Sequence, residues 1–262
     1  MSLPADRVFI TGASSGIGAA LAREYAARGA SLGLLARRRS LLEELAASLP
    51  HPERHRIYAA DVTDHDAVAA AAAADFIAAK GGADIVIASA GISHGTLTER
   101  PTDLAVFDAV FATNVNATVA TFAPFIASMK AQQGPRRLVG IGSVAGIRGM
   151  RGAGAYCASK AAVHSYCESL RLELRASGIK VVTIAPGYID TPMTRKNRFP
   201  MPFLMSAERF ATQAAKVIAR GSSYRVLPWQ MGVAAKLLRL LPNPLFDLAF
   251  SRAPTKQRQG EA

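Results

Sequence analysis

The sequence predicts an α/β fold in one domain: a doubly wound parallel sheet between two layers of helices, three layers in all. Short apolar runs alternate with segments of helical periodicity from Arg7 to Pro186. The runs are continuously hydrophobic, which is typical of strands that are buried on both faces. A glycine-rich turn joins the first run to the first helix, and helices of this kind supply the crossover connections that parallel strands need.

The expected elements follow in order along the chain. The strands cover residues 7–11, 31–36, 55–60, 84–91, 136–143, 180–186 and 223–227. Between them, apolar residues recur every three or four positions, which predicts helices. The first helix runs from the end of the glycine turn to residue 27. The other helices cover residues 38–49, 66–79, 103–130, 154–176 and 206–219. The 66–79 segment is alanine-rich, and alanine is the best helix former.

The alternation becomes less regular towards the C-terminus. Residues 190–210 are expected to form a lid over a substrate, because 190–205 contain three prolines and several Met and Phe side chains. Residues 228–262 form an apolar and basic C-terminal extension that is interrupted by prolines. No internal repeat divides the chain, so residues 1–262 are predicted to form one domain.

Composition argues against several classes of protein. The opening MSLPADRVFITG lacks a basic segment followed by an apolar run, and no uninterrupted apolar stretch is long enough to span a membrane. A cytoplasmic location is therefore expected. Cys157 and Cys167 lie about 15 Å apart if they share a helix, too far for a disulfide. The five histidines form no pattern typical of a metal site, so no metal is expected.

The formal net charge of +12 raises the question of a nucleic-acid partner. Basic clusters lie at residues 37–39, 136–137, 148–151 and 195–198. They are dispersed over several segments and form no single basic stripe, and no nucleic-acid-binding motif accompanies them. We therefore expect no nucleic acid. An anionic small ligand or an acidic partner surface fits the charge at least as well.

The turn after the first strand reads TGASSGIG (11–18) and opens the first helix. Gly12, Gly16 and Gly18 permit a tight turn, close approach of a pyrophosphate and close helix–strand packing. The N-terminus of the helix offers unpaired N–H groups and a partial positive charge. In this strand–loop–helix context the motif predicts dinucleotide binding in a Rossmann fold.

The end of the second strand distinguishes between the two nicotinamide dinucleotides. NAD sites usually have an acidic residue there, which binds the ribose 2′-hydroxyl. This chain has Ala36 at that position, followed by Arg37 and Arg38. Arginine can hold a 2′-phosphate with bidentate hydrogen bonds, so the segment favours NADP over NAD. The alternative is that these arginines are simply the solvated start of a helix.

Tyr156 and Lys160 lie four positions apart on a predicted helix and share a face. A tyrosine ordinarily titrates too high to exchange protons at neutral pH, and a nearby ammonium group lowers its pKa. Ser143, at the end of the fifth strand, could donate a hydrogen bond to a carbonyl. A Tyr-x-x-x-Lys pair is common on helix surfaces, so the pair gains weight only from its context.

Together these features resemble the short-chain dehydrogenase/reductase family from about residue 6 to residue 192. The order and spacing match, including the thirteen residues from Ser143 to Tyr156. The matching segments are TGASSGIG (11–18), Asp61, Asn114, Ser143, YCASK (156–160) and PGYIDT (186–191). The resemblance implies a nicotinamide-dependent oxidoreductase with an Asn-Ser-Tyr-Lys catalytic tetrad.

The resemblance implies a role for each member of the tetrad. Tyr156 would donate or accept the proton, and Lys160 would hold the nicotinamide ribose and lower the pKa of Tyr156. Ser143 would polarise the substrate carbonyl, and Asn114 would order a water in a proton relay through Lys160. The implied cofactor contacts are Gly12, Ser14, Ser15, Gly16, Ile17, Gly18, Arg37, Arg38, Asp61 (at the adenine), Val62, Ala90, Gly91, Tyr156, Lys160, Pro186, Gly187, Ile189 and Thr191.

One segment departs from the family pattern. An asparagine usually precedes Ala-Gly after the fourth strand, whereas this chain reads ASAG with Ala88 and Ser89. We expect Ser89 to replace some of the missing hydrogen bonds. His164 has no recognisable partner and is expected to be structural, as are both cysteines.

The combined prediction is an NADP(H)-dependent oxidoreductase that transfers hydride between nicotinamide and a carbonyl or secondary alcohol, with Tyr156 as general acid or base. A lipophilic substrate is favoured, in contact with Ser143, Tyr156, Met193 and Phe199, because Met and Phe side chains of the expected lid could line an apolar pocket. The alternative is that these side chains simply cover the core. A 3-oxoacyl-(acyl-carrier-protein) reductase is an alternative, because Lys196 and its arginine neighbours could face an acidic carrier. A non-catalytic NADP-binding sensor on the same fold is an alternative of another class.

Partners are predicted only in outline. The substrate is a small molecule, and the protein is expected to form a homodimer or homotetramer. Residues 231–250 are apolar with sparse basic side chains, so they could touch a membrane surface or, more simply, pack against a second subunit.

Overall fold

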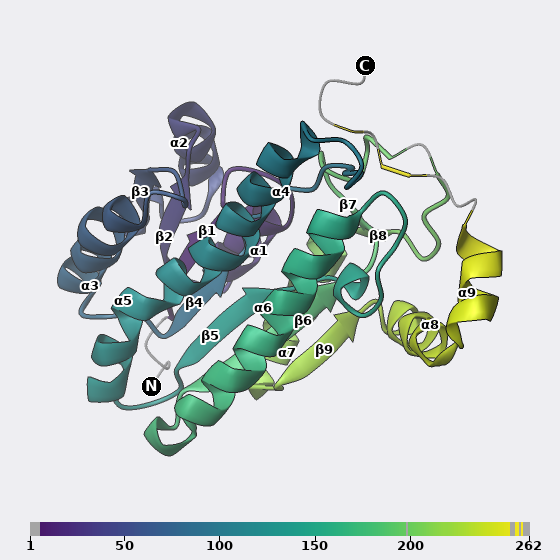
Figure 1. Cartoon of the computed structure of the whole chain (residues 1–262). Coiled ribbons are helices and arrows are strands. Elements are labelled where there is room, and N and C mark those ends of the chain that lie inside the picture. Colours follow the sequence, from purple (N-terminus) through teal and green to yellow (C-terminus); the bar gives the residue numbers. More distant parts are fainter. Residues whose placement is uncertain (1–5, 198, 252–254, 257, 259–262) are drawn as a thin grey trace.

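A computed structural model describes residues 6–197, 199–251, 255–256 and 258. Seven parallel strands form one sheet in the order β3-β2-β1-β4-β5-β6-β9 (Figure 1). The strands are β1 (Arg7–Thr11), β2 (Ser31–Ala36), β3 (Arg56–Ala59), β4 (Ile85–Ala88), β5 (Arg137–Ile141), β6 (Lys180–Pro186) and β9 (Tyr224–Leu227). The predicted parallel sheet is confirmed.

Helices cover both faces of the sheet, which confirms the three-layer architecture (Figure 1). Helices α1, α2 and α7 pack into one apolar core, and α3, α5 and α6 pack into a second core on the opposite face. The helices are α1 (Gly16–Ala27), α2 (Arg39–Ser48), α3 (Ala74–Lys80), α4 (Asp103–Phe111), α5 (Ala117–Ala131), α6 (Gly154–Glu173), α7 (Ala207–Arg220), α8 (Trp229–Leu240) and α9 (Asn243–Phe250).

Strand β1 shows why the apolar runs are continuous. Val8 and Ile10 face the core that contains α1 and α7, and Phe9 faces the other core. The Phe9 ring lies 5.6 Å from the ring of Phe76 and 4.9 Å from that of Phe125, measured between centroids. Because successive side chains point to opposite faces, a strand covered on both sides needs an apolar residue at every position.

Two predicted helices contain turns that the sequence pattern did not reveal. The 66–79 segment starts as a π-helix at Ala67–Ala73, and the 103–130 segment contains another at Ala112–Asn116. Apolar periodicity over a long window does not distinguish one wide turn from ordinary helix. The continuous helix Asp103–Ala131 is long and apolar enough to cross a membrane by composition alone. Here it lies against the sheet, with Phe122 and Phe125 fully buried in the core.

The C-terminal part is more regular than expected. Strands β7 (Ile189–Asp190) and β8 (Met205–Ser206) pair in parallel and close the intervening segment into a loop. Helices α8 and α9 follow at the side of the molecule, beyond β9 (Figure 1). Arg148 fixes them to the loop after β5: its guanidinium donates to the Leu241 carbonyl at 2.7 Å and lies 3.8 Å from the centroid of Phe246.

The order of strands determines where a ligand can bind. β1 lies beside β4 in the middle of the sheet. The chain runs from β1 outward to β2 and β3 on one side, and from β4 outward to β5 and β6 on the other, so the strand order reverses between β1 and β4. In open parallel sheets, crevices form at the carboxyl ends of the strands on either side of such a point. The glycine turn after β1 and the segment after β4 both start at this crevice.

Candidate active site

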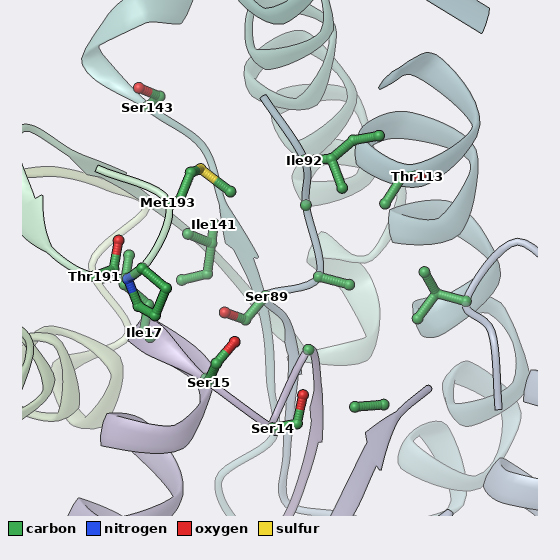
Figure 2. A pocket seen from close by; sticks show the side chains of 18 of the residues that line it. Ser14, Ser15, Ile17, Ser89, Ile92, Thr113, Ile141, Ser143, Thr191 and Met193 are labelled. Atoms are coloured by element: carbon green, nitrogen blue, oxygen red, sulfur yellow. The ribbon is translucent and has the colours of Figure 1, made fainter. Parts of the chain in front are cut away.

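A cavity of about 570 Å³ opens at the carboxyl ends of the strands. This volume lies within the range of small-molecule sites. Figure 2 shows side chains from the glycine turn, the segment after β4, β5 and the loop after β7 around it. Every predicted cofactor contact lines this cavity: Gly12, Ser14, Ser15, Gly16, Ile17, Gly18, Arg37, Arg38, Asp61, Val62, Ala90, Gly91, Tyr156, Lys160, Pro186, Gly187, Ile189 and Thr191.

The glycine turn packs more closely than side chains would allow. Gly12 has a φ of +69°, and a Cβ there would lie 2.7 Å from the Cα of Ala90. A Cβ at Gly18 would lie 2.2 Å from the carbonyl oxygen of Gly12. The turn therefore lies directly against the end of β4, and the first turn of α1 borders the cavity. Its first N–H groups have no partner within the helix and can bind an anion.

Ser89 tests whether this cavity suits a polar ligand. Its buried Oγ has no hydrogen-bond partner among the described residues, and the side chain lines the cavity (Figure 2). The expectation that Ser89 replaces internal hydrogen bonds of the family asparagine is therefore wrong in this structure. A buried hydroxyl without a partner is costly, so a polar group of a ligand at this point would stabilise it. Together with the open N-terminus of α1, it fits a dinucleotide.

The two arginines after β2 lie in different surroundings. The Arg38 Nη2 atom lies 3.1 Å from both the Ser14 and the Ser15 hydroxyl oxygens of the glycine turn. Arg37 is largely exposed and lies 3.7 Å from the carboxylate of Asp61. Asp61 also accepts hydrogen bonds from the backbone N–H and the hydroxyl of Thr63. The structure therefore places Arg38, more than Arg37, where it would meet a phosphate bound at the turn.

Tyr156 and Ser143 meet at the other end of the cavity. Burial raises the pKa of Tyr156 above its ordinary value, and its interaction with the Ser143 hydroxyl partly opposes this shift. The Lys160 Nζ lies 5.9 Å from the centroid of the ring, and burial is the largest effect on the pKa of Tyr156. The lowering of this pKa by Lys160 stays a prediction. Tyr156 holds its proton at neutral pH.

Lys160 is almost fully buried and donates a hydrogen bond to the Ile141 carbonyl at 2.8 Å. Burial lowers its pKa to about 8. A Cβ on Gly91 would lie 3.6 Å from Nζ, so the ammonium reaches across to the segment after β4. An ammonium that is removed from water and held by one carbonyl can still donate to hydroxyl groups of a ligand.

Asn114 supports the cavity from behind and does not line it, as far as the structure describes the lining. It is fully buried within the π-helical segment. Its Oδ1 accepts from the Ile92 N–H at 2.8 Å, and its Nδ2 donates to the Ile92 carbonyl at 3.0 Å and to the Ser159 hydroxyl at 2.9 Å. The side chain thereby fixes the segment after β4 against α6. The expected water relay stays a prediction.

His164 has a partner that sequence reasoning missed. Its Nε2 lies 3.4 Å from the backbone nitrogen of Ser143 and accepts a hydrogen bond from it. The ring also packs edge-on against Tyr224, with centroids 5.5 Å apart. Burial and the charge of Lys160 lower the pKa of His164 to about 4, so it is a neutral acceptor at pH 7. The one available clue was position, since His164 lies one helical turn after Lys160.

The predicted substrate residues divide into two groups. Ser143, Tyr156 and Met193 line the cavity. Phe199 lies outside the lining described here, because its ring packs edge-on against Tyr188 with centroids 6.2 Å apart. Arg198, part of the predicted basic cluster, lies outside the described residues.

The C-terminal extension brings two further residues to this region. Lys256 donates a hydrogen bond to the Ser93 hydroxyl at 2.6 Å, and its Nζ lies 4.9 Å from the centroid of the Tyr156 ring. Arg258 forms a bidentate salt bridge with Asp103. No motif in the sequence indicated that residues so far apart along the chain would meet.

Comparison with known proteins identifies the family. The chain matches the short chain dehydrogenase family over residues 6–201. It is 37% identical over 251 residues to an uncharacterized oxidoreductase of Myxococcus xanthus, covering 93% of this chain and 95% of that protein. It is 39% identical over 194 residues to galactitol 2-dehydrogenase (L-tagatose-forming) of Cereibacter sphaeroides, covering 72% of this chain and 73% of that enzyme.

Solved structures agree with the sequence comparison. The 3-ketoacyl-(acyl-carrier-protein) reductase of Brucella melitensis, crystallised with NADH, superimposes with a TM-score of 0.76 at 25% identity. The match covers 86% of this chain and 98% of that one. Fold, cavity and family match agree, and the chain therefore belongs to the short-chain dehydrogenase/reductase family of oxidoreductases.

Proposed function

We propose that this protein is an NADP(H)-dependent oxidoreductase that interconverts a carbonyl group and a secondary or primary alcohol of a small molecule. The observation that carries the proposal is the cavity itself. At one end the glycine turn and Arg38 offer N–H and guanidinium donors, and at the other end Ser143 and Tyr156 lie together above Lys160. A dinucleotide spanning the cavity would bring its nicotinamide to these hydroxyl groups.

The bound nicotinamide supplies or accepts the hydride. The protein's own residues handle the oxygen and the proton. Ser143 donates a hydrogen bond to the substrate oxygen, and Tyr156, protonated at neutral pH, gives its proton to that oxygen during reduction. Lys160 lies on the same face of α6 and offers N–H donors to the nucleotide ribose and to the phenolic oxygen.

The preference for NADP rests on two features of the nucleotide end. Ala36 leaves no carboxylate at the end of β2 to bind a ribose 2′-hydroxyl. Arg38 is held at the glycine turn by the Ser14 and Ser15 hydroxyls, where a 2′-phosphate could form charge-assisted hydrogen bonds with it. Reduction with NADPH is the working direction that we propose.

A lipophilic substrate is supported less than the sequence suggested. Of the two lid residues predicted to contact it, Met193 lines the cavity, but Phe199 packs on Tyr188 and does not. A 3-oxoacyl-carrier reductase stays an alternative, which the likeness to the Brucella melitensis enzyme favours. A non-catalytic NADP sensor is less favoured, since the chain has all four members of the predicted tetrad.

A screen of aldehydes, ketones and 3-oxoacyl thioesters, each with NADPH and NADH, tests the proposal. We expect at least one carbonyl class to be reduced, with kcat/KM higher for NADPH. Arg38→Ala should lower kcat/KM for NADPH about 10-fold or more and leave that for NADH nearly unchanged, since a charge-assisted pair contributes about 1.5–3 kcal/mol. Arg37→Ala is the matched control and should change the ratio of kcat/KM for NADPH to kcat/KM for NADH less than Arg38→Ala does. Nucleotide binding without turnover of any carbonyl would support the sensor instead.

Family members act on small molecules and are often oligomeric. We infer a homodimer or homotetramer here, and a cytoplasmic location in which the α8–α9 region contacts a second subunit or a membrane surface. Nucleic acid has no place in this proposal.

A further inference from the structure

The C-terminal extension approaches the substrate end of the cavity, because Lys256 lies beside Tyr156, one of the residues that line it. We call Thr255, Lys256 and Arg258 the strap; it is drawn in yellow beyond α9 in Figure 1. Thr255 lies against Gly152, where a Cβ would be 2.6 Å from its Cγ2 atom. The strap therefore contacts the loop that precedes α6, the helix that carries Tyr156.

A partly buried ion pair holds the strap in place. The Arg258 guanidinium donates to both carboxylate oxygens of Asp103, at 2.9 Å and 2.7 Å, and the side chains are 19% and 9% exposed. Asp103 also accepts a hydrogen bond from the Leu97 N–H at 2.8 Å, and these bonds lower its pKa to about 2. Arg258 forms a parallel bridge with Gly95 as well. A fully hydrogen-bonded, bidentate pair of this kind fixes geometry.

The same strap places Lys256 beside the reacting tyrosine. The Lys256 Nζ lies 4.9 Å from the centroid of the Tyr156 ring and 2.6 Å from the Ser93 hydroxyl oxygen. No carboxylate pairs with this ammonium among the residues that the structure describes. Burial lowers its pKa, so the charged form is partly desolvated without a compensating anion. Such a group is costly in the free protein and is stabilised by any anion that reaches it.

Two more basic side chains interact electrostatically in this region. His94 follows Ser93 on the segment after β4, and Lys196 belongs to the loop between β7 and β8. The charges of Lys196 and Lys256 both act on His94 and, after burial itself, help to hold its pKa below the ordinary value. Basic groups from three segments thus lie within electrostatic reach of one another near Tyr156, whereas the Asp103 carboxylate is already paired with Arg258.

We propose that Lys256 is a substrate-recognition residue and that the substrate is a small carbonyl compound carrying an anionic carboxylate, sulfonate or phosphate group a few bonds from the reacting carbon. This inference rests on the proposed function, because it places the carbonyl at Ser143 and Tyr156. An anionic group on such a substrate accepts hydrogen bonds from Lys256 and from Ser93, in the place of water. A neutral lipophilic chain would leave the ammonium without an anionic partner.

Paired substrates of equal length test the inference. With NADPH, succinate semialdehyde is compared with butanal, and 4-oxopentanoate with 2-pentanone. The wild type should reduce the anionic member of at least one pair with a kcat/KM about 10-fold or more above that of the neutral member. Lys256→Met should lower kcat/KM for the anionic member about 10- to 100-fold, mainly through KM, and leave the neutral member within about twofold.

Two further variants separate recognition from folding. Lys256→Arg keeps the charge and should retain most of the preference for the anionic member. Lys236→Met removes an exposed lysine of α8 and is the matched control, with no effect on the preference. Lys256→Arg and Lys236→Met should melt at the temperature of the wild type, and Lys256→Met, which removes a partly desolvated ammonium, should melt at that temperature or above it.

A binding measurement keeps the inference apart from the proposed function. Calorimetric titration of the NADP⁺-loaded protein with succinate should show binding in the wild type and at least 10-fold weaker binding in Lys256→Met. If no carbonyl is reduced, the proposed function fails, and the titration still decides the inference. The inference is overturned if the wild type turns over both members of each pair equally. It is also overturned if Lys256→Met lowers kcat/KM for both members alike, or raises it for both.

Discussion

At the scale of single residues, burial shifts the pKa values of two neighbouring groups of the site in opposite directions. Tyr156 keeps its proton because burial raises its pKa, whereas burial lowers the pKa of Lys160 to about 8. The spacing of four residues on a helix correctly predicted that these side chains share a face. It could not predict which effect dominates, because desolvation depends on the strands and loops that cover both groups.

His164 provides a pH-dependent test at this scale. Its pKa of about 4 lies below the ordinary value of about 6.5, so the unfolded chain binds its proton first as the pH falls. Its contribution to stability is therefore complete above pH 6.5 and is lost between pH 6.5 and 4. In urea unfolding, lowering the pH from 7 to 5 should cost the wild type about 2 kcal/mol more than it costs His164→Gln.

The glutamine retains an acceptor for the Ser143 N–H, so His164→Gln should fold and keep its activity at pH 7. His65→Gln, at an exposed position, serves as the control and should show the pH dependence of the wild type. An unchanged pH dependence in His164→Gln would contradict the neutral, buried histidine described here.

At the scale of elements, the π-helical turn between α4 and α5 links the two ends of the catalytic site. The turn carries Asn114, which holds both backbone groups of Ile92 and the Ser159 hydroxyl. In this way one side chain connects the segment after β4 to α6, which carries Tyr156. Wide helical turns of this kind occur frequently at functional sites.

Removing this connection should destabilise the protein. Asn114→Ala removes the side-chain partner of the part-buried Ile92 N–H and carbonyl and of the buried Ser159 hydroxyl, which should cost about 3 kcal/mol. For a chain of this size the melting temperature should fall by roughly 6–12 °C in differential scanning calorimetry. Asn116→Ala, on the exposed side of the same turn, should change stability by less than about 0.5 kcal/mol. Equal effects of the two substitutions would show that Asn114 is not the connecting residue.

Local patterns were enough to predict most elements. Continuous apolar runs located the seven parallel strands, and the glycine turn located the crevice, because both depend on neighbours along the chain. The π-helical turns and the Arg258–Asp103 pair were not predictable, since one depends on packing and the other joins residues far apart in sequence. Ser89 was misread because a serine hydroxyl can face either the protein or a ligand, and only the fold decides.

At the scale of the whole molecule, one of the basic clusters, Arg136 and Arg137, has a structural use. Arg136 donates to the carbonyls of Met129 and Gln132 at the end of α5, and Arg137 donates to those of Ile218 and Ala219 at the end of α7. Cations at the carboxyl ends of helices are stabilising. This use agrees with the dispersed distribution that the sequence showed.

The α8–α9 surface is the second feature at this scale. Both helices expose large apolar side chains, and Figure 1 shows them beyond the edge strand β9. The surface comprises Trp229, Val233, Leu237, Leu240, Leu245 and Leu248. An apolar surface of this extent is typical of contact with another molecule.

We expect this surface to join two copies of the chain. The triple substitution of Leu237, Leu240 and Leu248 by Gln should lower the molar mass measured by light scattering, whereas Leu172→Gln on α6 should not. A wild type that is monomeric and sediments with anionic lipid vesicles would favour the membrane alternative. A monomeric wild type that does not sediment with vesicles would contradict both the subunit contact and the membrane contact.

The most direct test of the account is the turnover of Tyr156→Phe. The substitution removes only the hydroxyl that we assign to proton transfer, and Tyr166→Phe on the same helix is the matched control. With NADPH and the best carbonyl from the screen, kcat of Tyr156→Phe should fall by about 10²–10⁴, while NADPH binding measured by fluorescence titration stays within about twofold. Full turnover in Tyr156→Phe would contradict the assignment of this hydroxyl as the acid and base of the reaction.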